Sequence, residues 1–243
     1  MNLIALTIAL FLPVVPSDKI PVGTVIPVML SSRLNAKAKP DESIDGKVMQ
    51  EITLPSGITI REGTRIQGHT VSVSKGKSGS SIVVKFTGLQ EEDRKVPVTI
   101  GVLAVASMAN VNEAHRPVGG NPDVDPDTQW VTRQVGGDVV KRGWGQVFSS
   151  GGVTGKWVGG SSVVIKLTPN EAAGCSTGPG YDREQAVWVF SSSACGTYGL
   201  GKTKVVNSGT GSHVGDITLT SNRDIDIRSG SGWMLIVVED PSQ

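Results

Sequence analysis

Short apolar runs, rich in valine and isoleucine and broken every few residues by glycine or proline, constrain the fold of this chain more than any other feature. Such runs occupy residues 22–30, 46–54, 65–75 and 82–89, and they return at 163–169, 185–193, 202–207, 216–221 and 233–239. β-Branched residues favour strands, and the 31 glycines and 13 prolines can form the turns between them. We therefore predict an all-β protein, with one weak helix candidate near 102–112.

The spacing of the runs predicts three parts after residue 19. Short, regularly spaced strands between 20 and 111 predict a small β-barrel. From 112 to 160 a glycine stands every few residues, which predicts a loop-rich, glycine-rich connector. Residues 161–243 resume the strand pattern and predict a second β-sandwich or barrel.

The amino end carries an apolar run of 13 residues, LIALTIALFLPVV at 3–15. A membrane-spanning helix needs about 20 residues, whereas this length suits the apolar region of a secretory signal peptide. No lysine or arginine precedes the run, so a buried first strand or helix is the alternative. We expect residues 1–19 to be a signal peptide and the protein to be bacterial and periplasmic, outer-membrane-associated or secreted.

The two cysteines, Cys175 and Cys195, are the only thiols of the chain. Two thiols are too few for a structural zinc site, and their spacing is not that of a redox motif. In an exported protein they most simply form one disulfide that closes a loop, and two unrelated buried thiols are the alternative.

Residues 196–203 match the phosphate-binding pattern G-x-x-x-x-G-K-[ST], ending in Gly201-Lys202-Thr203. That motif works only where a helix follows the loop and its N–H groups meet the phosphates. The residues after Thr203, KVVNSGTGSHVGD, favour a strand and a turn instead. We therefore expect no nucleotide binding, and the net charge of +1 gives no support for a nucleic-acid partner.

Two groups of aspartates are weak ligand candidates. Asp123, Asp125 and Asp127 alternate as calcium ligands can, but the loop lacks the glycine and the bidentate glutamate of a calcium site. A solvated, proline-stiffened turn is therefore favoured, and no metal or cofactor is predicted. A second set is expected to carry only charge at strand ends and edges: Asp216, Asp224 and Asp226.

The three histidines, His69, His115 and His213, are predicted to lie on the surface. Ser212, His213 and Asp216 are close in sequence, but no strand-to-helix elbow holds the serine for nucleophilic attack. We predict no catalytic residues and no enzyme activity.

All five tryptophans lie beyond residue 125. Trp188 and Trp233 stand in apolar runs and are predicted to be core residues. Trp130, Trp144 and Trp157 stand among glycines, where exposed rings can stack on sugars or anchor a protein interface. The alternative is that these three fill small cores beneath long loops.

Residues 20–89 resemble the β-barrel domain of the TrbI/VirB10-like proteins of conjugation and type IV secretion. The matching stretches are IPVGTVIPVML (20–30), GKVMQEI (46–52), ITIREGTRIQGH (58–69) and VVKFTGL (83–89). Glycine and proline in these positions set the turns of a small barrel. The resemblance implies a β module of the cell envelope and brings no catalytic residues with it.

These observations predict a non-enzymatic structural, assembly or binding protein of the bacterial envelope, with features of a secretion system. Its expected partner is another envelope protein or a second copy of itself. The alternative is a secreted carbohydrate-binding or adhesive module that uses the tryptophans at 130, 144 and 157. A hydrolase with an unrecognised site is the third hypothesis.

Overall fold

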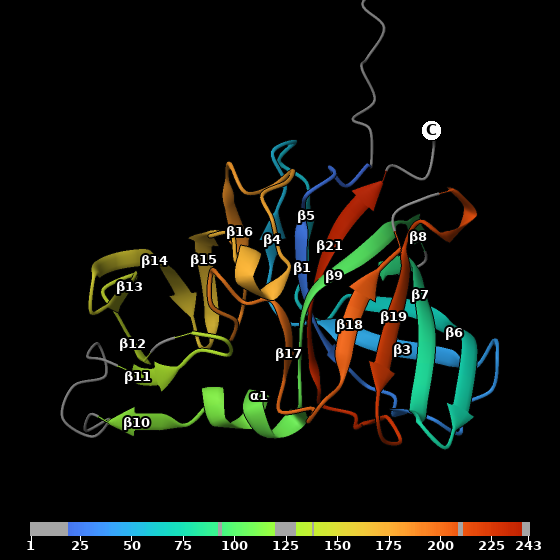
Figure 1. The fold of residues 1–243 in the computed structure, drawn as a ribbon. Coiled ribbons are helices and arrows are strands. Elements are labelled where there is room, and N and C mark those ends of the chain that lie inside the picture. Colours follow the sequence, from blue (N-terminus) through green and yellow to red (C-terminus); the bar gives the residue numbers. More distant parts are fainter. Residues whose placement is uncertain (1–18, 92–93, 120–129, 138, 209–210, 240–243) are drawn as a thin grey trace, which may run out of the picture.

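The computed structural model describes residues 19–91, 94–119, 130–137, 139–208 and 211–239. Strands make up 55% of the structure and helices about 6%, which confirms the predicted all-β class. The described strands form two large sheets and two short two-stranded pairs (Figure 1).

The first sheet has ten strands in the order β17-β9-β21-β1-β3-β6-β7-β19-β18, with β8 beside β7. Side chains along β7 alternate between buried and half-buried, which is the pattern of a strand with one face on a core. The ten strands are β1 (Val25–Leu30), β3 (Ser43–Val48), β6 (Arg65–Gly76), β7 (Gly79–Glu91), β8 (Arg94–Pro97), β9 (Thr99–Ala106), β17 (Gly196–Tyr198), β18 (Lys204–Asn207), β19 (Asp216–Ser221) and β21 (Gly232–Glu239).

Strands from both ends of the chain build this first sheet. β21 lies between β1 and β9 and pairs antiparallel with both, and β19 pairs with β7. The sheet therefore differs from the predicted division, in which residues 161–243 formed a second sandwich or barrel. An alternating pattern marks a strand but does not identify the strand with which it pairs.

The first sheet is not a closed barrel, in contrast to the prediction for residues 20–111, because its end strands do not join by backbone pairing among the described residues. Asn207 of β18 nevertheless reaches across to β9. Its side-chain amide donates to the carbonyl of Val102 at 2.8 Å, and its amide oxygen accepts from the Val102 N–H at 2.8 Å. Hydrogen bonds from one side chain thus connect β18 to β9, where no backbone pairing joins the two described strands.

The second sheet is a seven-stranded antiparallel meander that the chain makes between β9 and β17. It includes most of the segment that was predicted to be a loop-rich connector, since the glycines there lie largely in hairpin turns and bulges between strands. Its strands are β10 (Pro117–Gly119), β11 (Trp130–Arg133), β12 (Val139–Gly143), β13 (Gln146–Ser149), β14 (Gly152–Gly159), β15 (Ser162–Lys166) and β16 (Glu184–Ala186).

Short elements complete the fold. Helix α1 (Met108–Ala114) follows β9 where the sequence had indicated a weak helix, and the Ser107 hydroxyl caps it by accepting from the Asn110 N–H at 3.2 Å. The two short pairs are β2 (Leu34–Asn35) with β20 (Asp226–Ile227), and β4 (Ile52–Thr53) with β5 (Thr59–Ile60). Two single turns of 3-10 helix are η1 (Glu171–Ala173) and η2 (Gly211–His213). Among the described residues no helix is long and apolar enough to cross a membrane.

Two hydrophobic cores hold the layers together. The first lies against the curved first sheet and contains Phe86 and Trp233, whose rings meet edge to face. The second joins the two sheets, because Val25 and Met234 of the first sheet pack there with Val147 of the second and with α1. In Figure 1 the second sheet accordingly lies beside β1, β9 and β17, with α1 below it.

A disulfide joins Cys175 and Cys195, which confirms the predicted pairing. Cys175 lies just after η1, and Cys195 directly precedes β17. β17 is parallel to β9 and re-enters the first sheet after the excursion through the second. The disulfide therefore fastens the returning chain close to the point where it rejoins the first sheet.

Candidate functional site

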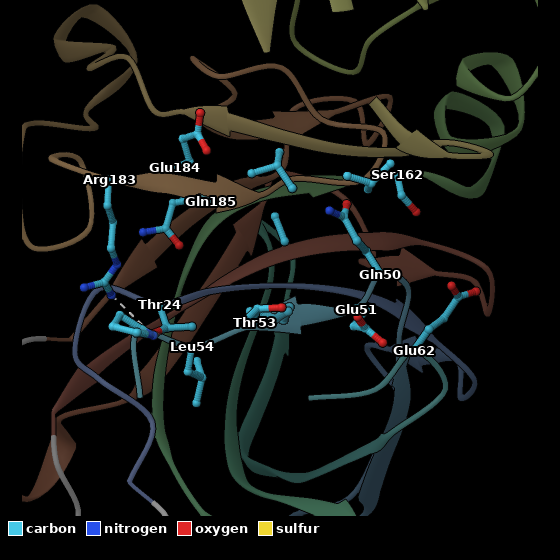
Figure 2. A pocket seen from close by; sticks show the side chains of 15 residues that line it. Thr24, Gln50, Glu51, Thr53, Leu54, Glu62, Ser162, Arg183, Glu184 and Gln185 are labelled. Carbon is cyan, nitrogen blue, oxygen red and sulfur yellow. Dashed lines mark hydrogen bonds between the residues drawn. The ribbon is translucent and has the colours of Figure 1, made fainter. Parts of the chain in front are cut away.

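A cleft of about 490 Å³ opens between the second sheet and the β4–β5 hairpin. Figure 2 shows Glu184 and Gln185 on one side of it and Thr53 and Leu54 on the opposite side. The lining comprises Thr24, Gln50, Glu51, Ile52, Thr53, Leu54, Pro55, Glu62, Val158, Ser162, Val164, Arg183, Glu184, Gln185 and Ala186.

The buried side chain of Gln50 fixes one side of the cleft to the second sheet. Its amide nitrogen donates to the Val163 carbonyl at 2.9 Å, and its amide oxygen accepts from the N–H groups of Val163 and Trp188 at 3.1 and 2.8 Å. This one side chain satisfies the buried N–H groups of Val163 and Trp188, and it adds a second donor to the Val163 carbonyl, which also accepts from the Val187 N–H at 3.0 Å. Gln50 therefore acts as a bridge between the two sheets.

Gln185 forms a second bridge, from β16 to the start of β1. Its amide oxygen accepts from the Val25 N–H at 3.1 Å, and its amide nitrogen donates to the carbonyls of Gly23 and Gly180 at 3.2 and 2.8 Å. Together the two glutamines set the spacing of the walls, so the cleft is formed before any ligand enters.

The charges around the cleft are unbalanced. Glu51, Glu62 and Glu184 line it, whereas Arg183 is the cation among its lining residues. The Arg183 guanidinium is already engaged, since it donates to the Val22 carbonyl at 3.3 Å and to the Thr24 hydroxyl at 3.2 Å. Lys156 on β14 pairs with Glu184 at 2.7 Å. The cleft thus favours positively charged or uncharged polar groups.

Among the described residues the cleft lining holds no histidine, cysteine or lysine, and its ionisable side chains are those of Arg183 and three glutamates. Within the described ranges no three carboxylate, histidine or cysteine side chains come together as metal ligands. The described lining residues can bind a ligand noncovalently, by hydrogen bonds and charge.

The tryptophans predicted as ligand or interface residues lie on the second sheet. Trp157 is half-buried against the second core, and its indole N–H donates to the Gly160 carbonyl at 2.9 Å. Its backbone N–H donates to Gly145, the neighbour of Trp144, at 2.9 Å, so Trp144 and Trp157 lie at the same end of the sheet. Trp130 pairs with Arg142 across β11 and β12.

Trp144 occupies a backbone conformation that few large residues adopt. It forms the two-residue turn between β12 and β13 with Gly145, with φ of +50° and +71° at the two positions. Turns of this type favour asparagine, aspartate and glycine, because other side chains are strained at positive φ. The Trp144 side chain is 68% exposed, so core packing does not explain its presence there. Such strain at an exposed aromatic residue is consistent with a role in binding.

The phosphate-loop motif forms a turn between two strands. After β17 the Thr203 N–H donates to the Leu200 carbonyl at 3.2 Å, and β18 begins at Lys204. The strand predicted after Thr203 is therefore present, in the place where a nucleotide site would need a helix.

The histidines and the second acidic set lie apart from the cleft. His213 contacts Asp216 at 3.0 Å, but it is 73% exposed, and among the described residues no serine hydroxyl bonds to it. Asp216 also lies 3.6 Å from Lys85.

The remaining histidines and aspartates of these two sets lie at separate places in the fold. His69 lies in β6, His115 follows α1, Asp224 pairs with Lys75, and Asp226 pairs with Arg33, which lowers the pKa of that carboxyl. Asp123, Asp125 and Asp127 lie outside the described residues.

Arg142 is a buried cation that the sequence did not reveal. It lies on β12 with only 1% of its surface exposed, and its Nε and Nη2 atoms have no hydrogen-bond partner among the described residues. Burial lowers the pKa of this guanidinium to about 10. On the neighbouring strand, the buried hydroxyl of Thr132 also lacks a partner within the described ranges.

The sequence did not reveal the cleft because its lining comes from two distant segments, within residues 24–62 and 158–186. One local feature pointed to it. Gln50 interrupts an apolar run and Gln185 begins another, each at a position where a strand would bury its side chain. Comparison of the chain with protein-family models, with curated proteins and with solved structures finds no match.

Proposed function

We propose that the chain is a non-enzymatic binding or assembly protein that works outside the bacterial cytoplasm, as a component of the cell envelope. The observation that carries this proposal is the open, polar cleft between the second sheet and the β4–β5 hairpin, whose walls are fixed by Gln50 and Gln185. A preformed cleft lined by hydrogen-bonding groups suits recognition rather than turnover.

Three features support the location. The Cys175–Cys195 disulfide is typical of proteins that fold in an oxidising compartment. The apolar run at 3–15 has the length of a signal-peptide core. The resemblance of residues 20–89 to the TrbI/VirB10-like domain favours the envelope, and with it a partner that is an envelope protein or a second copy of the chain.

Cell fractionation with amino-terminal sequencing of the mature protein tests this proposal. We expect the protein in the periplasmic or outer-membrane fraction, without residues 1–19, and with its two cysteines protected from alkylation until reductant is added. A cytosolic, uncleaved product with two free thiols would contradict the proposed location and role together.

Site-specific photo-crosslinking in intact cells tests the binding surface. A photoreactive residue in place of Val158, which lines the cleft and is 57% exposed, should give discrete crosslinked products. The matched control is Val206 on β18, which is 61% exposed and does not line the cleft. Equal crosslinking from both positions would contradict a binding role for the cleft.

A secreted carbohydrate-binding module is the second candidate, favoured by the strained and exposed ring of Trp144 close to Trp157. Aromatic rings at one end of a sheet can stack on sugar rings. Retention of the protein on insoluble glycans, abolished by Trp144→Ala, would support this function. No retention on cellulose, chitin or peptidoglycan would contradict it.

A further inference from the structure

Two strands with an unpaired edge line the cleft between the second sheet and the β4–β5 hairpin. Among the described strands, β4 pairs only with β5, and β16 is the end strand of the second sheet and pairs only with β15. Glu51 and Thr53, at and beside β4, line the cleft, as do Glu184 and Ala186 of β16. An unpaired edge presents backbone N–H and C=O groups that can pair with another strand.

In the β4 segment, the backbone N–H and C=O groups of alternate residues point away from β5. Leu54 donates its N–H to the Ile58 carbonyl at 2.8 Å. Two residues earlier, Ile52 lies opposite Ile60 and so has the same orientation toward β5. In an antiparallel pair the residues that bond to the partner strand alternate with residues that do not. Glu51 and Thr53 therefore direct their backbone groups away from β5.

The same reasoning applies to β16. Val187 donates its N–H to the Val163 carbonyl at 3.0 Å, and Gln185 lies opposite Ile165. The alternation then directs the backbone groups of Glu184 and Ala186 away from β15. Each edge thus offers outward groups on two residues spaced two apart, which is the repeat of an incoming strand.

The cleft is large enough for such a strand and is kept open. Its volume of about 490 Å³ falls in the range of about 300–1,000 Å³ typical of ligand sites. Gln50 and Gln185 bond across to the opposite layer through side chains, so these two residues connect the layers without backbone pairing. The edges therefore remain available.

Charge selects among possible segments. Among the described residues three carboxylates line the cleft, of which Glu184 already pairs with Lys156 at 2.7 Å, and the lining cation Arg183 donates to Val22 and Thr24. Lysine or arginine side chains of an incoming strand would meet Glu51 or Glu62, and opposite charges across an interface favour binding and set its register.

We propose that this cleft binds an extended, basic segment of a partner polypeptide, which adds a β-strand along the free edge of β4 or β16. Backbone hydrogen bonds supply affinity in this mode, and the acidic side chains supply specificity. The inference rests on the proposed binding role and names the chemistry of the partner.

Fluorescence anisotropy with purified, oxidised protein tests the proposal. The probe is a labelled eight-residue peptide in which lysine alternates with valine. The comparison peptides have glutamate in place of each lysine, or N-methyl groups on alternate backbone nitrogens. We expect saturable binding of the lysine peptide, at least tenfold weaker binding of both comparison peptides, and weaker binding at 0.5 M salt.

Backbone hydrogen exchange locates the bound peptide. Saturating peptide should slow exchange at least tenfold at Glu51 and Thr53, or at Glu184 and Ala186, whereas Ile52 and Gln185 should not change. A double variant, Glu51→Gln with Glu62→Gln, should weaken binding at least fivefold. Glu171→Gln, which removes an exposed carboxylate outside the cleft lining, is the matched control and should bind as the wild type does.

Three results would each overturn the proposal. The first is no binding of the lysine peptide up to 1 mM, and the second is equal binding of the N-methylated peptide. The third is binding of a chitosan tetrasaccharide with no slowed exchange at either edge, which would assign the cleft to cationic glycans. Because these measurements use purified protein, their failure leaves the envelope location, tested by fractionation, as a separate result.

Discussion

Replacing Arg142 with methionine should make the protein more stable. Arg142 is 1% exposed, and its Nε and Nη2 atoms find no hydrogen-bond partner among the described residues. Within those residues no carboxylate forms an ion pair with it. A buried charge without a partner keeps its desolvation cost, whereas methionine fills a similar space with apolar atoms.

The pKa of Arg142 sets the size of the effect. Burial lowers that pKa from its ordinary value to about 10, and each pKa unit corresponds to about 1.4 kcal/mol, so the charged side chain costs about 3 kcal/mol in the folded state. Relaxation of the side chain toward water would recover part of this. We therefore expect Arg142→Met to raise the free energy of unfolding by about 1–3 kcal/mol.

Urea unfolding followed by tryptophan fluorescence measures this difference, with the slope compared between proteins. The pH dependence gives a second test. Above about pH 10 the folded chain loses the proton on Arg142 while the unfolded chain still keeps it, so wild-type stability gains from rising pH there. The advantage of the methionine variant should therefore be full below pH 10 and shrink above it.

Two controls separate charge from packing. Arg142→Lys keeps a buried charge and should bring no gain. Arg133→Met removes a cation on the adjacent strand, which is mostly exposed and lies 3.9 Å from Glu113, and should change stability little. A loss of more than about 1 kcal/mol in Arg142→Met would refute the reasoning, because it would show that Arg142 has a stabilising partner.

Four further predictions concern the disulfide, the bridges and the loops. Replacing Cys175 and Cys195 together by serine should lower the free energy of unfolding by about 3 kcal/mol, from the entropy of a loop closed over a separation of 20 residues, and equal urea midpoints with and without the bridge would contradict this. Gln50→Ala leaves the buried N–H groups of Val163 and Trp188 without their partner and should cost about 3 kcal/mol in the same assay, so a loss below about 1 kcal/mol would show that water replaces the amide. Trp144→Asn should raise stability by about 1 kcal/mol, because asparagine tolerates positive φ, and a fall would show that the indole packs. Lys202→Ala should leave the thermal midpoint unchanged, and magnesium ATP should not raise that of the wild type, so saturable stabilisation by ATP would refute the assignment of this turn.

Much of the local structure was predictable. The alternating run of β7, the turn and strand after Thr203, and the cysteine pair all follow from patterns within a few residues or from the count of thiols. The glycine-rich segment after residue 111 was harder, because its strands are short and separated by turns, and glycine weakens the strand pattern.

The cleft and the buried charge could not be predicted in the same way. Gln50 contacts Val163 across 113 positions of sequence, and no pattern around either residue identifies the other. A charged residue such as Arg142 is expected on the exposed face of a strand. Only the packing of β12 on the second core shows that it is buried.

The sequence by itself determined that the chain forms strands, where most of them turn, and that two cysteines could close one loop. These properties depend on backbone preference and on side-chain alternation, which act over neighbouring residues. Only the tertiary structure decided that β21 lies between β1 and β9, that a seven-stranded sheet is inserted before β17, and that two free edges face one cleft. Strand pairing is a contact between distant segments, and any strand with one apolar face satisfies the local pattern equally well.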